Sequence, residues 1–413
     1  MKLGINGMGR IGKLSLWHHL ANKSFAELVV NVGRPVGKSL ADLAHVVEHD
    51  STYGRLSHFL HGYHGHHRPL IEDLDEASGR MVIDGTPVRF LRSHRNPREI
   101  GWREHGVRLV VDCTGVFTDP TALADAGSGA LRGHLDAGAE RVVLSAPFKI
   151  KTSGLAMPED AVTTVMGIND EMYNPGRHSL ISAASCTTTC LAYMMKPMLD
   201  HFGADRILSA SMVTVHAATS SQVVLDALPA ANASDLRKNR SVMNNLILTT
   251  TGAAKALRLV LPEMGEIGMM AESVRVPIAT SSLIILTLNL QSESRDNPIN
   301  RTDINQVYQE AAQGACAGHL VFSDRQNVSA DMIGFPQAAV TIEGTETHTR
   351  TAYTRVNLDR IASLTPVVRE AMACHTLEVP VTQAVVYGWY DNEMGSYANM
   401  LGKLTVGIAD KIL

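Results

Sequence analysis

A glycine-rich turn near the N-terminus restricts the fold more than any other feature of this sequence. Gly7-Met-Gly9-Arg-Ile-Gly12 follows a short apolar segment at 2–6 and precedes a stretch with helical apolar spacing at 13–21. A second apolar segment follows at 26–31. In such a unit the first glycine permits a tight turn, the second lets a pyrophosphate approach, and the third allows close helix packing. The alternative is a plain strand–helix turn without a ligand.

The rest of the chain separates into two regions that differ in their pattern of predicted strands and helices. Strand-like segments at 108–114 and 141–145 continue the first pattern, which predicts an α/β domain with a Rossmann-type doubly wound parallel sheet. After residue 186, β-rich runs at 207–215, 274–290, 338–342 and 383–390 are separated by helical stretches such as 304–317. We expect an NAD(P)-binding domain over 1–185, completed by a C-terminal helix within 393–413. We expect residues 186–392 to form an α+β catalytic domain on a mainly antiparallel or mixed sheet.

Composition excludes several classes of protein. The 413 residues carry a formal net charge of −4, which predicts no general affinity for nucleic acid or anionic lipid. No apolar run reaches the length of a membrane span, and the N-terminal segment reads as a strand and not as a secretory signal. Five scattered cysteines indicate reduced thiols in a cytoplasmic protein.

Cys186 is a candidate nucleophile. It lies between a strand-like segment at 179–184 and a helical stretch at 191–202, which puts its thiol at a helix N-terminus. Free backbone N–H groups and the helix dipole there favour an anion, so we expect a lowered thiol pKa. A buried cysteine that acts as a small apolar residue is the alternative.

His216 and two anion-binding features could complete a catalytic site. His216 lies at the end of a strand-like run, and an imidazole near a thiol can accept the proton of the thiol and donate it back. The segment 249–255, Thr-Thr-Thr-Gly-Ala-Ala-Lys, supplies hydroxyls and a glycine N–H before a helix, and Arg275 offers a guanidinium that suits phosphate. Each residue alone also has an ordinary structural explanation.

The second strand lacks the acidic residue that usually binds the adenosine ribose. Its end reads Asn31-Val-Gly-Arg34. Because an acid would repel a 2′-phosphate and an arginine can accommodate one, we hypothesise that NADP is accepted. Arg34 could instead be a solvated loop charge.

A histidine-rich segment at 58–67 has spacing that permits metal binding. No cysteine or carboxylate joins it, so an exposed loop is the favoured interpretation and no metal site is predicted.

Taken together, these motifs resemble those of the phosphorylating glyceraldehyde-3-phosphate dehydrogenase family, of which the chain looks like a long, divergent, bacterial-type member. The resemblance runs nearly end to end. Its segments are Gly4-Ile-Asn-Gly-Met-Gly-Arg-Ile-Gly12, Asp50-Ser-Thr-Tyr-Gly-Arg55, Thr114-Gly-Val-Phe-Thr118, Ser145-Ala-Pro147, Val165-Met-Gly-Ile-Asn169, Ala184-Ser-Cys-Thr-Thr188, Thr250-Thr-Gly-Ala-Ala-Lys-Ala256, Arg275-Val-Pro277 and Trp389-Tyr-Asp-Asn-Glu393.

The resemblance implies an activity and a set of roles. Cys186 would attack the aldehyde of D-glyceraldehyde 3-phosphate, with His216 as base, and phosphate would release the thioester as 1,3-bisphosphoglycerate. Positions that match phosphate contacts are Ser185, Thr187, Thr219, Lys238, Thr251, Gly252 and Arg275. Positions that match or line the cofactor site are Gly7, Gly9, Arg10, Ile11, Gly12, Arg34, Arg95, Thr114, Gly115, Ser145 and Asn392. A homotetramer is also implied, whereas the physiological direction, glycolytic or gluconeogenic, is not.

Departures from the family pattern keep alternatives open. Thr189 replaces the usual Asn, and Lys238 stands where an Arg often contributes to the phosphate site. Leu228-Pro229 resembles NAD-using members, against the argument for NADP. Extra length is expected near 56–75, 119–134 and 343–380. The alternative functions are an erythrose-4-phosphate dehydrogenase and a non-catalytic, cofactor-sensing binding protein.

Overall fold

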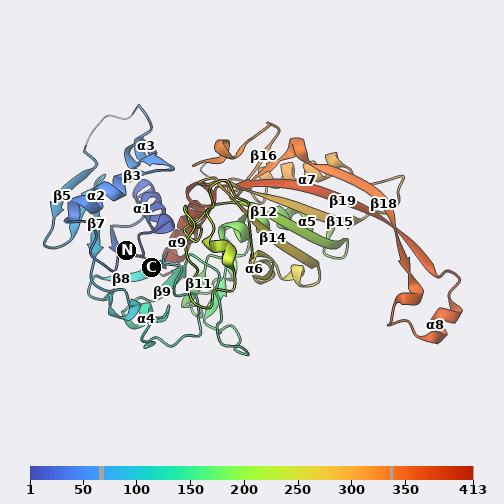
Figure 1. Ribbon diagram of the computed structural model, residues 1–413, viewed down its shortest axis with the longest axis horizontal. Coiled ribbons are helices and arrows are strands. Elements are labelled where there is room, and N and C mark those ends of the chain that lie inside the picture. Colours follow the sequence, from blue (N-terminus) through green and yellow to red (C-terminus); the bar gives the residue numbers. More distant parts are fainter. Residues whose placement is uncertain (65–68, 335–337, 413) are drawn as a thin grey trace.

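Two sheets form the framework of the protein in this computed structural model, which describes residues 1–64, 69–334 and 338–412. The first sheet, of nine strands, has the order β10-β11-β9-β8-β1-β2-β7-β6-β5 (Figure 1). Its strands are β1 (Lys2–Asn6), β2 (Glu27–Asn31), β5 (Ile71–Asp75), β6 (Arg80–Ile83), β7 (Thr86–Leu91), β8 (Val107–Asp112), β9 (Arg141–Leu144), β10 (Ala161–Thr163) and β11 (Leu180–Ser182). All pairings from β10 to β7 are parallel, and β6 and β5 add an antiparallel edge.

The direction of winding reverses between β1 and β8. The chain passes from β1 to β2 on one side, whereas β8 and β9 lie on the other. Side chains at the carboxyl ends of these two strands therefore border a crevice, which is where open α/β sheets bind ligands. The helices of this part are α1 (Arg10–Asn22), α2 (Leu40–Glu48), α3 (Leu56–His61) and α4 (Gly133–Asp136).

The second sheet, of eight strands, has the order β13-β14-β12-β15-β19-β17-β16, with β18 paired to β19. Its strands are β12 (Ile207–Ala217), β13 (Ile247–Thr249), β14 (Gly268–Val276), β15 (Ser282–Gln291), β16 (Leu320–Ser323), β17 (Val340–Glu343), β18 (His348–Asn357) and β19 (Thr376–Tyr390). The sheet is mixed: β12–β14 and β16–β17 are parallel pairs and the other pairs are antiparallel, so the predicted fold class is confirmed. Helices α5 (Cys186–Phe202), α6 (Ala253–Val260) and α7 (Arg301–Gln313) accompany this sheet.

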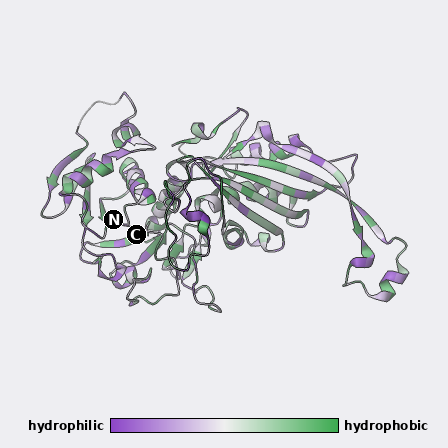
Figure 2. Ribbon diagram, in the orientation of Figure 1, coloured by the Kyte–Doolittle hydropathy of each residue, from purple (hydrophilic) through white to green (hydrophobic). Residues whose placement is uncertain are grey.

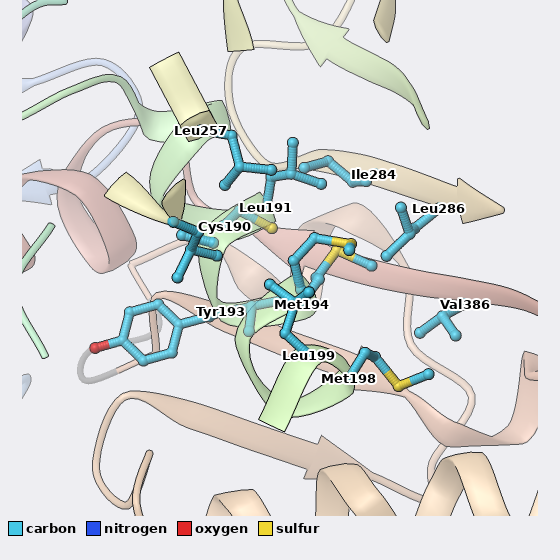
Figure 3. Packing of buried hydrophobic residues seen from close by; sticks show 14 of the residues in the cluster. Cys190, Leu191, Tyr193, Met194, Met198, Leu199, Leu257, Ile284, Leu286 and Val386 are labelled. Atoms are coloured by element: carbon cyan, nitrogen blue, oxygen red, sulfur yellow. The ribbon is translucent and has the colours of Figure 1, made fainter. Parts of the chain in front are cut away.

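Helix α5 is the centre of the second core. Tyr193, Met194 and Met198 are fully buried and pack among Leu257 of α6 and the inward residues of the sheet, such as Leu286 (Figure 3). The strands around it are mainly apolar (Figure 2). A helix that is apolar on nearly every side is held by its surroundings, and its first turn is therefore fixed in space.

The β-rich run expected at 274–290 contains parts of two strands. β14 ends at Val276, and Pro277, which cannot donate to the hydrogen-bond ladder, follows it. Ser281, at φ +70°, then redirects the chain into β15.

The C-terminal helix α9 (Asn399–Asp410) returns to the first sheet. It packs against α1, and its Leu401 and Leu404 belong to the first core. A polar network also joins the two parts: Arg10 donates to both Asp50 and Glu393, and the hydroxyl of Tyr53 donates to Asp391 at 2.7 Å. The domain boundary at 185/186 stays a prediction.

The outer halves of β18 and β19 form a two-stranded arm that projects away from the body, with α8 (Pro366–Ala371) near its tip (Figure 1). β15 pairs with β19 only from Val381 onward, so residues 376–380 pair with β18 alone. The arm falls within the extra length expected near 343–380.

Candidate active site

Cys186 is the first residue of α5, as the sequence predicted, and the helix begins earlier than residue 191. Ser185 is the N-cap, and its Oγ accepts a hydrogen bond from the N–H of Thr188 at 3.1 Å. Ala184 joins β11 to this cap with φ +53°, a left-handed conformation that is costly for a residue with a side chain. The strained turn presents the thiol at the carboxyl end of the first sheet.

His216 lies near the end of β12 and faces the thiol. Its Nε2 is 3.8 Å from Cys186 Sγ. The ring is buried, and Tyr390 packs edge-on against it with ring centroids 6.1 Å apart. The structure therefore brings together the two residues that the sequence singled out.

Two neighbours compete for the other ring nitrogen of His216. Arg275 Nη1 lies 2.6 Å from Nδ1, and the carbonyl oxygen of Ala217 lies 2.7 Å from it. A guanidinium can only donate and a carbonyl can only accept, so the two contacts require opposite tautomers. Only when Nδ1–H donates to Ala217 does Nε2 present a lone pair that can take the proton of Cys186.

The charges in the site favour a neutral thiol–imidazole pair. Burial lowers the pKa of His216 to about 4, and the positive charge of Arg275 acts in the same direction. Burial raises the pKa of the Cys186 thiol, although the hydroxyl and N–H of Thr187 and the charge of Arg275 oppose this. The expected lowering of the thiol pKa was therefore wrong for the site in this state, because burial outweighs the groups that stabilise the thiolate.

A cavity of about 610 Å³ surrounds this pair. The helix α6 begins at its wall, with Gly252 as N-cap, so the N-termini of two helices meet at one cavity. Arg275 adds a fixed positive charge, and this combination suits phosphate groups. The predicted residues that line this cavity are Arg10, Ile11, Ser145, Ser185, Cys186, Thr187, His216, Thr219, Thr251, Gly252, Arg275 and Asn392.

A second cavity, of about 760 Å³, lies beyond the glycine turn. The predicted residues that line it are Gly7, Arg34, Arg95 and Thr114. Asn6, Asn31 and Val32 also contribute, so the cavity lies where β1, β2 and β8 end.

The glycine turn and Asn392 fit a dinucleotide. A Cβ on Gly12 would lie 1.9 Å from the carbonyl oxygen of Gly7, so the helix can approach the strand this closely only because residue 12 is a glycine. A Cβ on Gly9 would meet no atom within 4 Å, and the space there leaves room for a pyrophosphate. Asn392 Oδ1 accepts from the N–H of Ser281 at 3.0 Å and from Thr280 Oγ1 at 3.1 Å. Its amide N–H₂ is thereby oriented as a donor at the cavity.

Some site residues differ from expectation. Lys238 lies in the short helical turn Leu236–Asn239 and, like Gly115, lines neither cavity. Lys149 and Lys255, which the sequence analysis did not name as site residues, both line the cavity around Cys186 and His216. Lys255 is the last residue of the segment 249–255 that was already noted, and Lys149 lies two residues after Ser145-Ala-Pro147, so this proximity was the signal.

Neither a metal centre nor a membrane span is found in the described ranges. Within 1–64, 69–334 and 338–412, no group of three His, Cys, Asp or Glu residues has the geometry to hold a metal ion. Residues 65–67 of the histidine-rich segment lie outside the described residues. Across the same ranges, every helix is too short or too polar to cross a bilayer.

The fold and the two cavities define a nucleotide-binding part joined to a part that carries a thiol site. Residues 1–120 match the NAD binding domain of glyceraldehyde 3-phosphate dehydrogenase, and residues 185–363 match the C-terminal domain of that enzyme. The chain therefore belongs to the glyceraldehyde-3-phosphate dehydrogenase family.

Curated relatives agree with this assignment over the whole chain. Glyceraldehyde-3-phosphate dehydrogenase of Streptomyces coelicolor is 34% identical over 414 residues, and glyceraldehyde-3-phosphate dehydrogenase 1 of Bacillus subtilis is 33% identical over 415. Both alignments cover 100% of this chain and 99% of the relative. Glyceraldehyde-3-phosphate dehydrogenase of Chlamydia pneumoniae is 36% identical over 341 residues, which is 82% of this chain and 88% of the relative.

Proposed function

We propose that the protein oxidises D-glyceraldehyde 3-phosphate with inorganic phosphate to 1,3-bisphosphoglycerate. The observation that carries the proposal is the 3.8 Å contact of Cys186 Sγ and His216 Nε2, at a cavity where two helix N-termini and Arg275 converge. Family membership supports it, since the curated relatives carry the name of this enzyme.

In the first step, Cys186 Sγ bonds to the aldehyde carbon while His216 Nε2 takes the thiol proton. His216 can act in this way when Arg275 is engaged by the phosphate of the substrate, because Nδ1–H then donates to the carbonyl of Ala217. The resulting alkoxide takes a proton back to give a thiohemiacetal. The N–H groups at the start of α5 can stabilise the negative oxygen.

NAD, when bound, supplies the acceptor for the hydride that leaves the thiohemiacetal carbon. His216 takes the hydroxyl proton as the carbon–oxygen bond becomes the thioester carbonyl. An oxygen of inorganic phosphate then bonds to that carbon, the carbon–sulfur bond breaks, and Cys186 leaves as a thiolate that is reprotonated. Asn392 can orient the carboxamide of the cofactor through its amide N–H₂, since its Oδ1 is held by the N–H of Ser281.

A Cys186→Ser variant tests covalent catalysis. We expect loss of nearly all NADH formation with D-glyceraldehyde 3-phosphate and phosphate. A matched Cys190→Ser variant changes a cysteine one turn along the same helix, whose sulfur contacts the carbonyl of Gly388 instead of the cavity. It should keep most of the activity. Turnover by Cys186→Ser at the wild-type rate would reject the proposal. Rates with erythrose 4-phosphate, with and without phosphate, separate the alternative substrate.

We also propose that NADP is accepted. Val32, Gly33 and Arg34 follow β2 without an acid, and no carboxylate of the described residues pairs with Arg34. Arg34 is exposed and lines the cavity beyond the glycine turn. Arg34→Ala should raise the KM for NADP much more than that for NAD, with the exposed Arg55→Ala as a control. Equal effects on both cofactors would leave Arg34 without a role in selectivity.

A cytoplasmic homotetramer is proposed from the family alone.

A further inference from the structure

A buried carboxylate lies behind the cavity beyond the glycine turn. Asp112 is the last residue of β8, at the reversal of winding, and is 0% exposed. It lines neither cavity, and the proposed catalytic steps do not use it. Burial would raise the pKa of Asp112, but hydrogen bonds from His134, Thr114 and Asn6 outweigh it and lower that pKa.

Four donors occupy the two oxygens of Asp112. Oδ1 accepts from the N–H of Thr114 at 2.9 Å and from its hydroxyl at 2.6 Å. Oδ2 accepts from Asn6 Nδ2 at 2.8 Å and from His134 Nε2 at 3.0 Å. A carboxylate has about four acceptor positions, so this one is fully used.

The direction of every hydrogen bond in this network is determined. The indole N–H of Trp102 can only donate, and it lies 2.8 Å from His134 Nδ1. His134 therefore carries its proton on Nε2 and donates to Asp112. The 3.4 Å contact between Asn6 Nδ2 and His134 Nε2 joins two donors and is not a hydrogen bond.

The network continues into the wall of the cavity. Asn31 Nδ2 donates to Asn6 Oδ1 at 2.8 Å and to the carbonyl of His94 at 3.0 Å. Asn6, Asn31, His94 and Thr114 all line this cavity, whereas Asp112 stands behind it. The carboxylate thus fixes residues from three strand ends and from the loop that carries Arg95.

We propose that Asp112 is a positioning residue for the adenosine half of the cofactor, which it serves by holding Asn6 and Thr114 in the cavity wall. The inference rests on the proposed function, since it assigns this cavity to that half. An asparagine cannot replace the carboxylate. An asparagine whose N–H₂ group pointed toward Thr114 would face the backbone N–H of that residue, which is also a donor. In the opposite orientation its N–H₂ group would face Asn6 and His134, which are both donors.

The test is the Ki of ADP-ribose, which represents the adenosine half, for displacement of bound NADH from the intact chain, a binding measurement that needs no turnover. Asp112→Asn should raise this Ki about tenfold, the effect of roughly one lost buried hydrogen bond. At saturating NAD, kcat should stay within about twofold of wild type. If Asp112 only stabilised the fold, Asp112→Asn would lower the melting temperature of the protein and leave the Ki of ADP-ribose unchanged.

The chain supplies a matched control. Asp119 Oδ1 accepts from the N–H and hydroxyl of Thr121 at 2.9 and 2.6 Å, the same local arrangement, but neither residue lines either of the two cavities described above. Asp119→Asn should leave the Ki of ADP-ribose unchanged. Equal effects of the two substitutions, or none from Asp112→Asn, would overturn the inference.

A second pair of variants tests the positioning role of Asp112 if Asp112→Asn does not fold. His134→Gln can still donate to Asp112 and should keep the affinity for ADP-ribose, whereas His134→Leu should lose it to a similar extent. Identical Ki values for these two variants would also overturn the inference. A wild-type protein that binds ADP-ribose but does not oxidise the aldehyde would reject the proposed function alone.

Discussion

A His18→Gln substitution is expected to make the protein less sensitive to acid. His18 lies on α1, and its ring packs against Gly402 of α9. Burial lowers the pKa of His18 from 6.5 to about 4, and the charge of Lys403 acts in the same direction. Between these two pH values the unfolded chain binds more protons than the folded one, so stability present above pH 6.5 is lost as the pH falls toward 4.

The two pKa values give the size of the effect. From pH 7 to pH 5, proton uptake by His18 in the unfolded chain lowers the free energy of unfolding by about 2 kcal/mol. The adjacent His19 is fully buried, its pKa is lowered in the same direction, and neither ring nitrogen has a hydrogen-bond partner within the described ranges. His18→Gln should therefore remove about 2 kcal/mol of the loss between these pH values and leave the part due to His19.

Urea unfolding at pH 7 and pH 5, followed by tryptophan fluorescence, measures this difference. Trp17 lies on the same helix and reports on its surroundings. The exposed His45 of α2, changed to Gln, controls for the loss of any histidine. If wild type and His18→Gln lose the same stability between the two pH values, the argument from burial at the α1–α9 contact is refuted.

Three further predictions concern the cofactor site and the contact between the two parts. Gly12→Ala should lower the melting temperature, because its Cβ would lie 1.9 Å from the carbonyl oxygen of Gly7. Gly9→Ala, whose Cβ would meet no atom within 4 Å, should leave the melting temperature unchanged and weaken NADH binding. Equal melting temperatures would contradict this. Asn392→Asp removes the amide donor and should raise the Kd for NADH about tenfold in a fluorescence titration, and an unchanged Kd would exclude that contact. Tyr53→Phe removes the hydrogen bond to Asp391 at 2.7 Å and should lower the free energy of unfolding by about 1 kcal/mol, so an unchanged urea midpoint would show that this bond contributes little.

Local patterns were enough to predict the first half of the fold. β1 covers the predicted residues 2–6, and the glycine turn opens α1, because tight turns and close helix contacts leave direct marks in the sequence. Cys186 at the start of α5 was also predictable, since a strand followed by small polar residues and a helix defines a helix N-terminus. The β-rich run at 274–290 did not show by itself that it holds parts of two strands, which Pro277 separates.

Local motifs were enough to indicate the class of fold and the family, and to single out Cys186 and His216 as candidates. The distance between these two side chains and the direction of their pKa shifts depend on the tertiary structure. The 3.8 Å contact of Cys186 and His216 and the contact of Arg275 with His216 join segments 30 and 59 residues apart. Burial reversed the expected direction of the thiol pKa, and burial depends on packing from distant parts of the chain. The Asp112 network likewise joins residues up to 128 positions apart, which no local pattern can indicate.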